Sequence, residues 1–273
     1  MSNKVLKPKK ASLYQFTQKY SNNIDNCIEF FKSMKWPEGF SCDRCGCHKY
    51  YLVKRVGKTK TSYVLECSSC HKQHSLLSGT IFQSCKLDLY KLLLGIFLFF
   101  NKNKGISAVD LCSILDVNYK TALLLENKCR ILMSLSNSDK LLNSLFYEAD
   151  VFNIGAKSKN KAGRASEQQP VLGILSTDKE NNYPRFIKLR LINDYTGLSL
   201  KKNIEQCCVL SHAALLNTDG EKGFNTLGTE IQVKNEKISY EEKNHRLLWL
   251  NIIIGNIKNN ITGIYHGITK REM

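Results

Sequence analysis

Two aspartates and one asparagine in the C-terminal half are the strongest candidates for chemistry. Asp150 lies in the apolar, strand-like run SLFYEADVFNI, Asp219 follows a second apolar stretch, and Asn256 lies in a predicted helix over residues 244–260. A carboxylate at the end of a buried strand is costly unless it is paired, protonated or bound to a metal. The alternative is that Asp150 only turns the chain where its strand ends. The first interpretation predicts a cation site.

The chemistry that suits two strand-end carboxylates and a helix oxygen is phosphoryl transfer with two divalent ions, one at the attacking oxygen and one at the leaving oxygen. Oxygen ligands favour magnesium or manganese. A helical stripe of Trp249, Ile252, Ile253 and Asn256 predicts that Asn256 faces the sheet. The sequence therefore predicts a two-ion site with three magnesium ligands, Asp150, Asp219 and Asn256. Glu148, on the same strand face as Asp150, is a candidate auxiliary acid.

A second predicted metal site consists of two Cys-x-x-Cys pairs, Cys42 with Cys45 and Cys67 with Cys70, joined by a predicted hairpin over residues 50–66. Four thiolates on facing loops are the ligands of structural zinc, which replaces a core that so small a segment lacks. Because four thiolates complete a closed site, the remaining neighbours are interpreted as ordinary loop residues; they are Cys47, His48, His71 and His74.

The composition indicates a polyanionic partner. The chain has 273 residues with 40 Lys and Arg against 24 Asp and Glu, a net charge of +16, and nucleic acid is the leading candidate partner for so basic a protein. An odd count of 11 cysteines and no secretory-type apolar start favour reduced thiols. The longest apolar run, residues 89–100, is too short to cross a bilayer and predicts a buried helix.

Four segments are predicted, giving an α+β multidomain fold. A loose basic arm over residues 1–24 precedes a zinc ribbon with a leading helix over 25–84, a helical region over 85–140, and a mixed β-sheet flanked by helices over 141–273. The helical region contains a helix-turn-helix pattern, in which Asp116-Val117 forms the turn and Asn118 caps the second helix. Any pair of packed helices shows the same pattern, so DNA reading by this region is a hypothesis.

Basic residues near these segments are candidate DNA contacts, although a solvated charged surface would look the same. They lie in the ribbon hairpin, in the second helix of the helical pair and in the loop SKNKAGRASEQQ, and are Lys54, Arg55, Lys58, Lys120, Lys128, Arg130, Lys157, Lys161 and Arg164. In the last segment, strands are predicted at residues 146–150, 170–176, 186–192 and 209–216, with helices near 198–206 and from 221.

The chain resembles the ISXO2-like insertion-sequence transposases, which join an N-terminal zinc ribbon to an RNase H-like domain with an Asp-Asp-Glu or Asp-Asp-Asn triad. The resemblance extends from about Cys27 to the C-terminus and rests on KWPEGFSCDRC, CSSC, LSGTIF, GISAVDL, EAD, KAGRASEQQPVLGIL, NTDGEKGF and IIGNIKNNITGIYHG. It implies that Asp150 and Asp219 are the first two metal ligands, that Asn256 is the third, and that Lys258 is a lysine of the catalytic set. A solvated helix lysine is the alternative for Lys258.

The resemblance further implies a bacterial, cytoplasmic and nucleoid-associated enzyme without a membrane partner. It would cleave and join double-stranded DNA at inverted-repeat ends and at a target, as a dimer or larger assembly, with structural zinc and two catalytic magnesium or manganese ions.

Three departures from the family pattern predict reduced or absent transposition. Val151 and Ala156 stand where relatives carry Glu and Gly, and the chain stops at Met273 where relatives continue with another helix. A zinc-ribbon DNA-binding protein without catalysis is therefore the second hypothesis, whereas a plain RNase H-like nuclease would not need the ribbon and the helical region. His245, near the start of the last helix, is either a residue that orients a ligand or DNA or a structural histidine.

Overall fold

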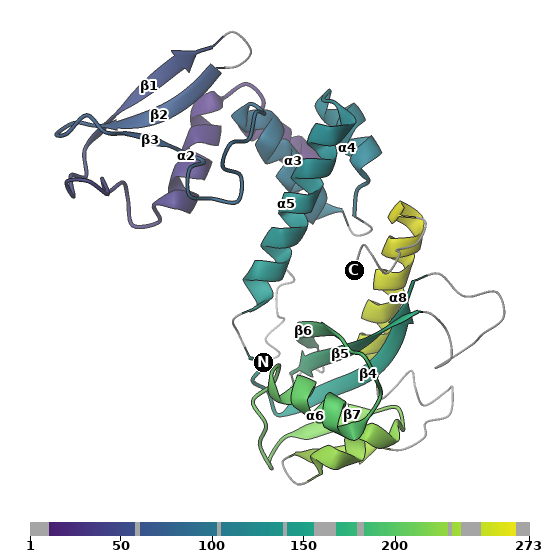
Figure 1. The fold of residues 1–273 in the computed structure, drawn as a ribbon. Helices are drawn as coiled ribbons and strands as arrows, with labels where there is room; N and C mark the ends of the chain where they lie inside the picture. Colours follow the sequence, from purple (N-terminus) through teal and green to yellow (C-terminus); the bar gives the residue numbers. More distant parts are fainter. Residues whose placement is uncertain are drawn as a thin grey trace, which may run out of the picture. The chain divides into compact units, whose positions relative to one another are not determined.

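The computed structural model describes residues 11–57, 61–102, 105–138, 141–155, 168–178, 183–228, 231–235 and 247–265. The chain divides into two compact units, Met1–Ser134 and Leu135–Met273 (Figure 1). Helices and two separate sheets confirm the predicted α+β class. Within the described ranges, no helix is long and apolar enough to cross a membrane.

The first unit opens with two helices, α1 (Leu13–Tyr20) and α2 (Ile24–Lys35). The expectation of a loose arm is wrong for α1, because Phe16 is buried and its ring stacks on Phe97 with 4.1 Å between ring centroids. Phe16, with Tyr20 partly buried against the same cluster, thus anchors this segment on the core. The side chain of Asn23 caps α2 by accepting the Asn26 N–H at 3.1 Å.

The predicted ribbon hairpin is confirmed. Strands β1 (Tyr50–Val56) and β2 (Thr61–Cys67) pair antiparallel, and a short third strand, β3 (Gln73–Ser75), pairs with β2. Strand β1 lies at the edge of this sheet. The tip of the hairpin, residues 58–60, lies outside the described residues.

Three helices complete the first unit: α3 (Leu89–Asn101), α4 (Ala108–Leu115) and α5 (Tyr119–Ser138), whose last residues, from Leu135, already belong to the second unit. The predicted helical pair is confirmed in α4 and α5, with Asp116 in the left-handed region at φ +50° and Asn118 accepting the Thr121 N–H at 2.8 Å. One buried cluster runs through ribbon and helices alike and includes Phe31, Leu65, Leu92, Leu111 and Leu125. The ribbon and the helices therefore share one core.

The second unit is built on a five-stranded mixed sheet with the order β6-β5-β4-β7-β8. Strands β4, β5 and β6 are antiparallel, whereas β7 is parallel to both β4 and β8. The bounds are β4 Phe146–Ile154, β5 Gln169–Thr177, β6 Pro184–Leu191, β7 Leu215–Thr218 and β8 Gln232–Asn235. The strand predicted over 209–216 begins only at Leu215, because a turn closed by Ala214 N–H to Ser211 O precedes it. Strand β8, short and polar, was not predicted.

Both faces of the sheet are covered by helices (Figure 1). On one face, Tyr147, Ala149 and Leu172 pack against α6 (Gly197–Glu205) and the 3-10 helix η2 (Lys222–Leu227). On the other face, Phe152 and Val171 pack against α8 (Leu248–Tyr265). Because side chains alternate along a strand, Glu148, Asp150 and Phe152 all belong to the α8 face.

Candidate active site and metal centre

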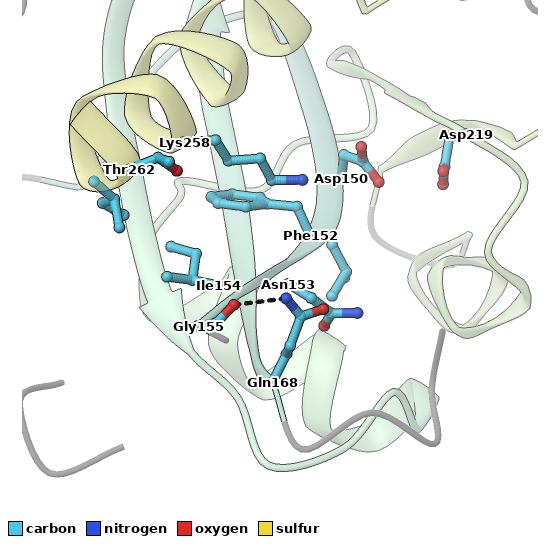
Figure 2. A pocket seen from close by; sticks show the side chains of 11 residues that line it. Asp150, Phe152, Asn153, Ile154, Gly155, Gln168, Asp219, Lys258 and Thr262 are labelled. Carbon is cyan, nitrogen blue, oxygen red and sulfur yellow. Dashed lines mark hydrogen bonds between the residues drawn. The ribbon is translucent and has the colours of Figure 1, made fainter. Parts of the chain in front are cut away.

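A cavity of about 600 Å³ opens where β4, β7 and α8 meet, and Asp150, Asp219 and Lys258 all line it (Figure 2). Strands β4 and β7 are adjacent and parallel, with Glu148 paired to Asn217. Two residues further on are Asp150, in the middle of β4 rather than at a strand end as predicted, and Asp219, one residue past the end of β7. The register therefore brings the two carboxylates to matching positions in the two segments. Both acids singled out by the sequence therefore line one cavity.

Asp219 lies in a loop fixed by a side-chain clamp. Asn235 of β8 accepts the hydroxyl proton of buried Thr218 at 2.6 Å, and its amide nitrogen donates to Glu221 O at 2.8 Å and to Asn225 Oδ1 at 2.7 Å. These bonds hold the residue before Asp219 and the loop after it, where Gly220 adopts φ +96°. A left-handed turn of this kind favours glycine.

Glu148 is the buried acid of the site, with 5% of its surface exposed. Its Oε2 accepts the backbone N–H of Leu250, in the first turn of α8, at 2.9 Å. Burial raises the pKa of Glu148 to about 7, and the hydrogen bond from Leu250 opposes that rise. Glu148 is not among the residues that line the cavity.

The structure contradicts the predicted placement of Asn256. The residues of α8 that line the cavity are Lys258, Ile261 and Thr262, whereas Asn256 is exposed and does not line it. Leu250 and Ile254 are the residues of α8 buried against the sheet. Of the stripe expected at 249, 252, 253 and 256, Trp249 and Ile253 pack partly buried against the same cluster, whereas Ile252 and Asn256 are exposed. The run LLWLNIII is apolar on most sides, so more than one stripe fits it, and packing on the sheet selected one centred on Leu250 and Ile254.

Asn251 is the asparagine of α8 that shares a helix face with Lys258, and the sequence analysis did not single it out. Seven residues turn an α-helix by nearly two full turns, so Asn251 lies within about 20° of Lys258, whereas Asn256 lies about 160° away. Asn251 is half-buried and stands between the two sheet contacts Leu250 and Ile254. The feature of the sequence that could have identified Asn251 is its spacing of seven residues from Lys258.

The remainder of the cavity is shaped by aromatic and amide groups. The Lys258 ammonium lies 5.6 Å from the centroid of the Phe152 ring, and Figure 2 shows this side chain extending over the ring toward Asp150. At the other end, Tyr195 donates its hydroxyl proton to Asn153 Oδ1 at 2.8 Å, and Gln168 Nε2 donates to Gly155 O at 2.7 Å. The cavity thus has one end with the Asp150 carboxylate and the Lys258 ammonium, and another end lined by the amides of Asn153 and Gln168.

The four predicted zinc ligands converge in the first unit. The sulfurs of Cys42, Cys45, Cys67 and Cys70 all lie within 4.8 Å of one another, and the Cys42–Cys70 and Cys45–Cys67 sulfur pairs are each 3.5 Å apart. Tetrahedral zinc with Zn–S bonds of about 2.3 Å requires sulfurs about 3.8 Å apart. The donor set and its spacing therefore fit a closed structural zinc site.

His74 is not the ordinary loop residue that the sequence suggested. It lies in β3, is 7% exposed, and its ring packs edge-on against the rings of Trp36 and Phe40. Its Nδ1 lies 3.7 Å from Asp43 Oδ1, and its Nε2 is buried without a hydrogen-bond partner. Because His74 and Asp43 group with Cys42, they belong to the surroundings of the same metal site.

The candidate DNA contacts differ in their surroundings. Lys54 and Arg55 are exposed on the edge strand β1, and Lys120 is exposed at the start of α5. Lys128 donates to Gln83 O at 3.1 Å, and Arg130 donates to both Glu126 and Asn127. Other predicted residues lie outside the described residues: Lys58, Lys157, Lys161, Arg164 and, from the active-site hypotheses, His245.

Comparison with known families yields two matches along the chain. Residues 23–73 match a transposase zinc-ribbon domain, and residues 145–273 match an ISXO2-like transposase domain. No curated protein matches the chain. The first match covers all four cysteines of the cluster, and the second contains both aspartates and α8.

Proposed function

Since the chain belongs to the ISXO2-like insertion-sequence transposases, we propose that it binds the ends of a mobile element and catalyses metal-dependent cleavage and strand transfer of double-stranded DNA. The observation that carries this proposal is the shared cavity of Asp150, in β4, and Asp219, which directly follows the adjacent parallel strand β7. In this proposal the first unit, with its ribbon and helical pair, positions the DNA.

Asp150 and Asp219 are proposed as the charged oxygen ligands of two magnesium or manganese ions. Their carboxylates supply the hard donors that these ions prefer. When bound, the two metal ions would activate the attacking hydroxyl or water and neutralise charge at the leaving oxygen. The Thr218–Asn235 clamp would fix the direction of the Asp219 carboxylate, and the packing of β4 against α8 would fix that of Asp150.

We propose Asn251, in place of Asn256, as the third oxygen ligand. Asn251 shares the helix face of Lys258, which lines the cavity, and a carbonyl oxygen from an amide can ligate a hard cation. An amide brings no negative charge, so the site would hold its ions less tightly than one with a third carboxylate. Lys258 would meet a phosphate of the DNA, since its ammonium lies in the same cavity as the carboxylates.

Zinc held by Cys42, Cys45, Cys67 and Cys70 is proposed to have a structural role, because four thiolates leave no open coordination position. The exposed cations Lys54, Arg55 and Lys120 are proposed DNA contacts in the first unit. Lys128 and Arg130 are weaker candidates, because contact with DNA would compete with their bonds to Gln83, Glu126 and Asn127.

The test is cleavage of DNA that carries the ends of the element, with magnesium or manganese, by the wild type and by Asp150→Asn and Asp219→Asn. Both variants should lose cleavage by more than about a hundredfold while binding the same DNA as tightly as the wild type. Cleavage that survives either substitution would refute the assignment. A wild-type protein that binds ends but never cuts, even in manganese, would support the alternative of a DNA-binding protein without catalysis.

A further inference from the structure

Residues 247–250, at the start of α8, carry no side-chain acceptor for the first amide groups of the helix. Residues 247–250 are Leu, Leu, Trp and Leu, and the first intrahelical bond of the helix runs from Asn251 N–H to Leu247 O. The amides before Asn251, including that of Leu250, therefore need an acceptor from outside the helix. Helices usually obtain one from a Ser, Thr, Asp or Asn side chain at the cap position, where this chain has Leu247.

Glu148 supplies that acceptor from a strand that lies 102 positions away in the sequence. Its carboxylate accepts the Leu250 N–H at 2.9 Å while only 5% of the residue is exposed. An anionic acceptor at a helix N-terminus gains from the hydrogen bond and from the helix dipole. From this geometry, and on the basis of the proposed function, we propose that Glu148 is a positioning residue that fixes α8 on β4 beside Asp150.

The spacing of the contacts along both elements supports this role. Glu148 contacts Leu250, and Phe152 lies beneath Lys258. The eight residue steps from Leu250 to Lys258 rise about 12 Å along the helix, and the four from Glu148 to Phe152 rise about 13 Å along the strand. The two contacts are therefore equally spaced along α8 and β4, which lie side by side. Asp150, midway between the two strand contacts, then lies opposite the helix segment between Asn251 and Lys258.

A direct metal-binding role for Glu148 fits the structure less well. Asp150 lines the cavity, whereas Glu148 does not. The Oε2 atom of Glu148 instead accepts a hydrogen bond from a backbone amide. A positioning role requires only an oxygen acceptor at this place, whereas metal ligation would require the negative charge. A neutral glutamine and an apolar leucine of similar size therefore separate the two roles.

The first measurement needs no catalysis: amide hydrogen exchange of the α8 N-terminus in the full-length chain, for the wild type, Glu148→Gln and Glu148→Leu. Glu148→Leu should speed exchange of the Leu250 amide by about tenfold or more, because the bond that protects it is lost. Glu148→Gln should keep most of the protection. Unchanged protection in Glu148→Leu would overturn the proposal, whether or not the protein cuts DNA.

The second measurement is metal-dependent DNA cleavage by the same variants, with Glu205→Leu as the control. Glu205 is an acid at the end of α6, on the opposite face of the sheet, paired only loosely with Lys201 at 3.8 Å. We expect Glu148→Gln to retain activity within about threefold of the wild type and Glu148→Leu to lose about tenfold or more. If Glu148→Gln is as inactive as Asp150→Asn, then Glu148 is a ligand and the positioning role is wrong.

Discussion

At the scale of single residues, the active-site proposal depends on which asparagine of α8 faces the carboxylates. Asn256 was the sequence-based choice, yet it is exposed and lies outside the cavity lining. Asn251 shares the face of Lys258 because seven residues make nearly two helical turns. The two positions carry the same side chain on one helix, so they form a matched pair for substitution.

We therefore predict different outcomes for Asn251→Ala and Asn256→Ala. Asn251→Ala should raise the magnesium concentration that gives half-maximal cleavage. The increase should be at least about tenfold to a hundredfold, which is what losing a residue that hydrogen-bonds to a metal ligand costs. Asn256→Ala should leave cleavage unchanged and alter the free energy of unfolding by less than about 0.5 kcal/mol. The measurement is a magnesium titration of cleavage, and the reverse ranking would restore the original assignment.

The Asn235 clamp gives a second prediction at this scale. Asn235→Ala removes bonds to Thr218, Glu221 and Asn225, which hold the loop that carries Asp219. The magnesium requirement should rise by about tenfold to a hundredfold, because the carboxylate is no longer held in one direction.

DNA binding measured without divalent metal serves as the control for Asn235→Ala. It should match that of the wild type, since the clamp lies in the second unit and the proposed DNA contacts Lys54, Arg55 and Lys120 lie in the first. An unchanged magnesium requirement would show that the loop keeps its shape without Asn235.

At the scale of elements, the approach of α8 to the sheet depends on a glycine beside the first aspartate. Gly173 of β5 pairs with Asp150, and a Cβ added at Gly173 would lie 3.3 Å from Leu250 Cδ1 and 3.3 Å from Phe152 Cε1. Contacts this short require a neighbour to move. The absence of a side chain at Gly173 is thus what allows the helix to pack close to β4, the strand that carries Asp150.

Gly173→Ala should destabilise the second unit by about 1–3 kcal/mol, the usual effect of overpacking, and lower cleavage as α8 shifts away from Asp150. Gly255→Ala is the control on the helix itself, because an added Cβ there meets nothing within 4 Å. It should stabilise the unit by about 0.5–1 kcal/mol through helix propensity. Denaturant unfolding measures both, and a Gly173→Ala variant as stable as the wild type would show that α8 repacks without strain.

At the scale of the whole molecule, the metal-binding cysteines belong to a core much larger than the ribbon. Cys42 and Cys67 are buried in the same cluster as Phe16 of α1, Leu92 of α3 and Leu125 of α5. The second unit has its own cores on the two faces of its sheet. Loss of zinc should therefore affect one compact unit as a whole and spare the other.

We predict that a zinc chelator unfolds or loosens residues 11–134, including α3 and α5, while amides of β4 and β5 remain protected from exchange. Binding of zinc and folding are coupled in such sites, so removal of the ion removes folding free energy. Hydrogen exchange resolved by segment measures the effect, and added zinc should reverse it. Protection lost only within residues 42–75 would show that the helices hold the shared core without the metal.

Features set by local chemistry were determined by the sequence itself. Cys-x-x-Cys spacing predicted the cysteine cluster, apolar runs separated by turn residues predicted β4 to β6, and the Asn118 cap predicted the start of α5. The sequence also singled out the two aspartates that line the cavity, because a carboxylate beside a buried apolar run is costly without a partner. These signals depend on residues close to one another in the chain.

Only the tertiary structure decided which face of α8 meets the sheet, because residues 247–254 are apolar on nearly every side and the sequence fits more than one packing. It also revealed that Glu148 caps that helix, that Asn235 holds the Asp219 loop, and that Phe16 ties α1 into the first core. Each of these contacts joins positions far apart in the chain, and the free energy that selects them comes from packing and hydrogen bonds that form only when the elements meet.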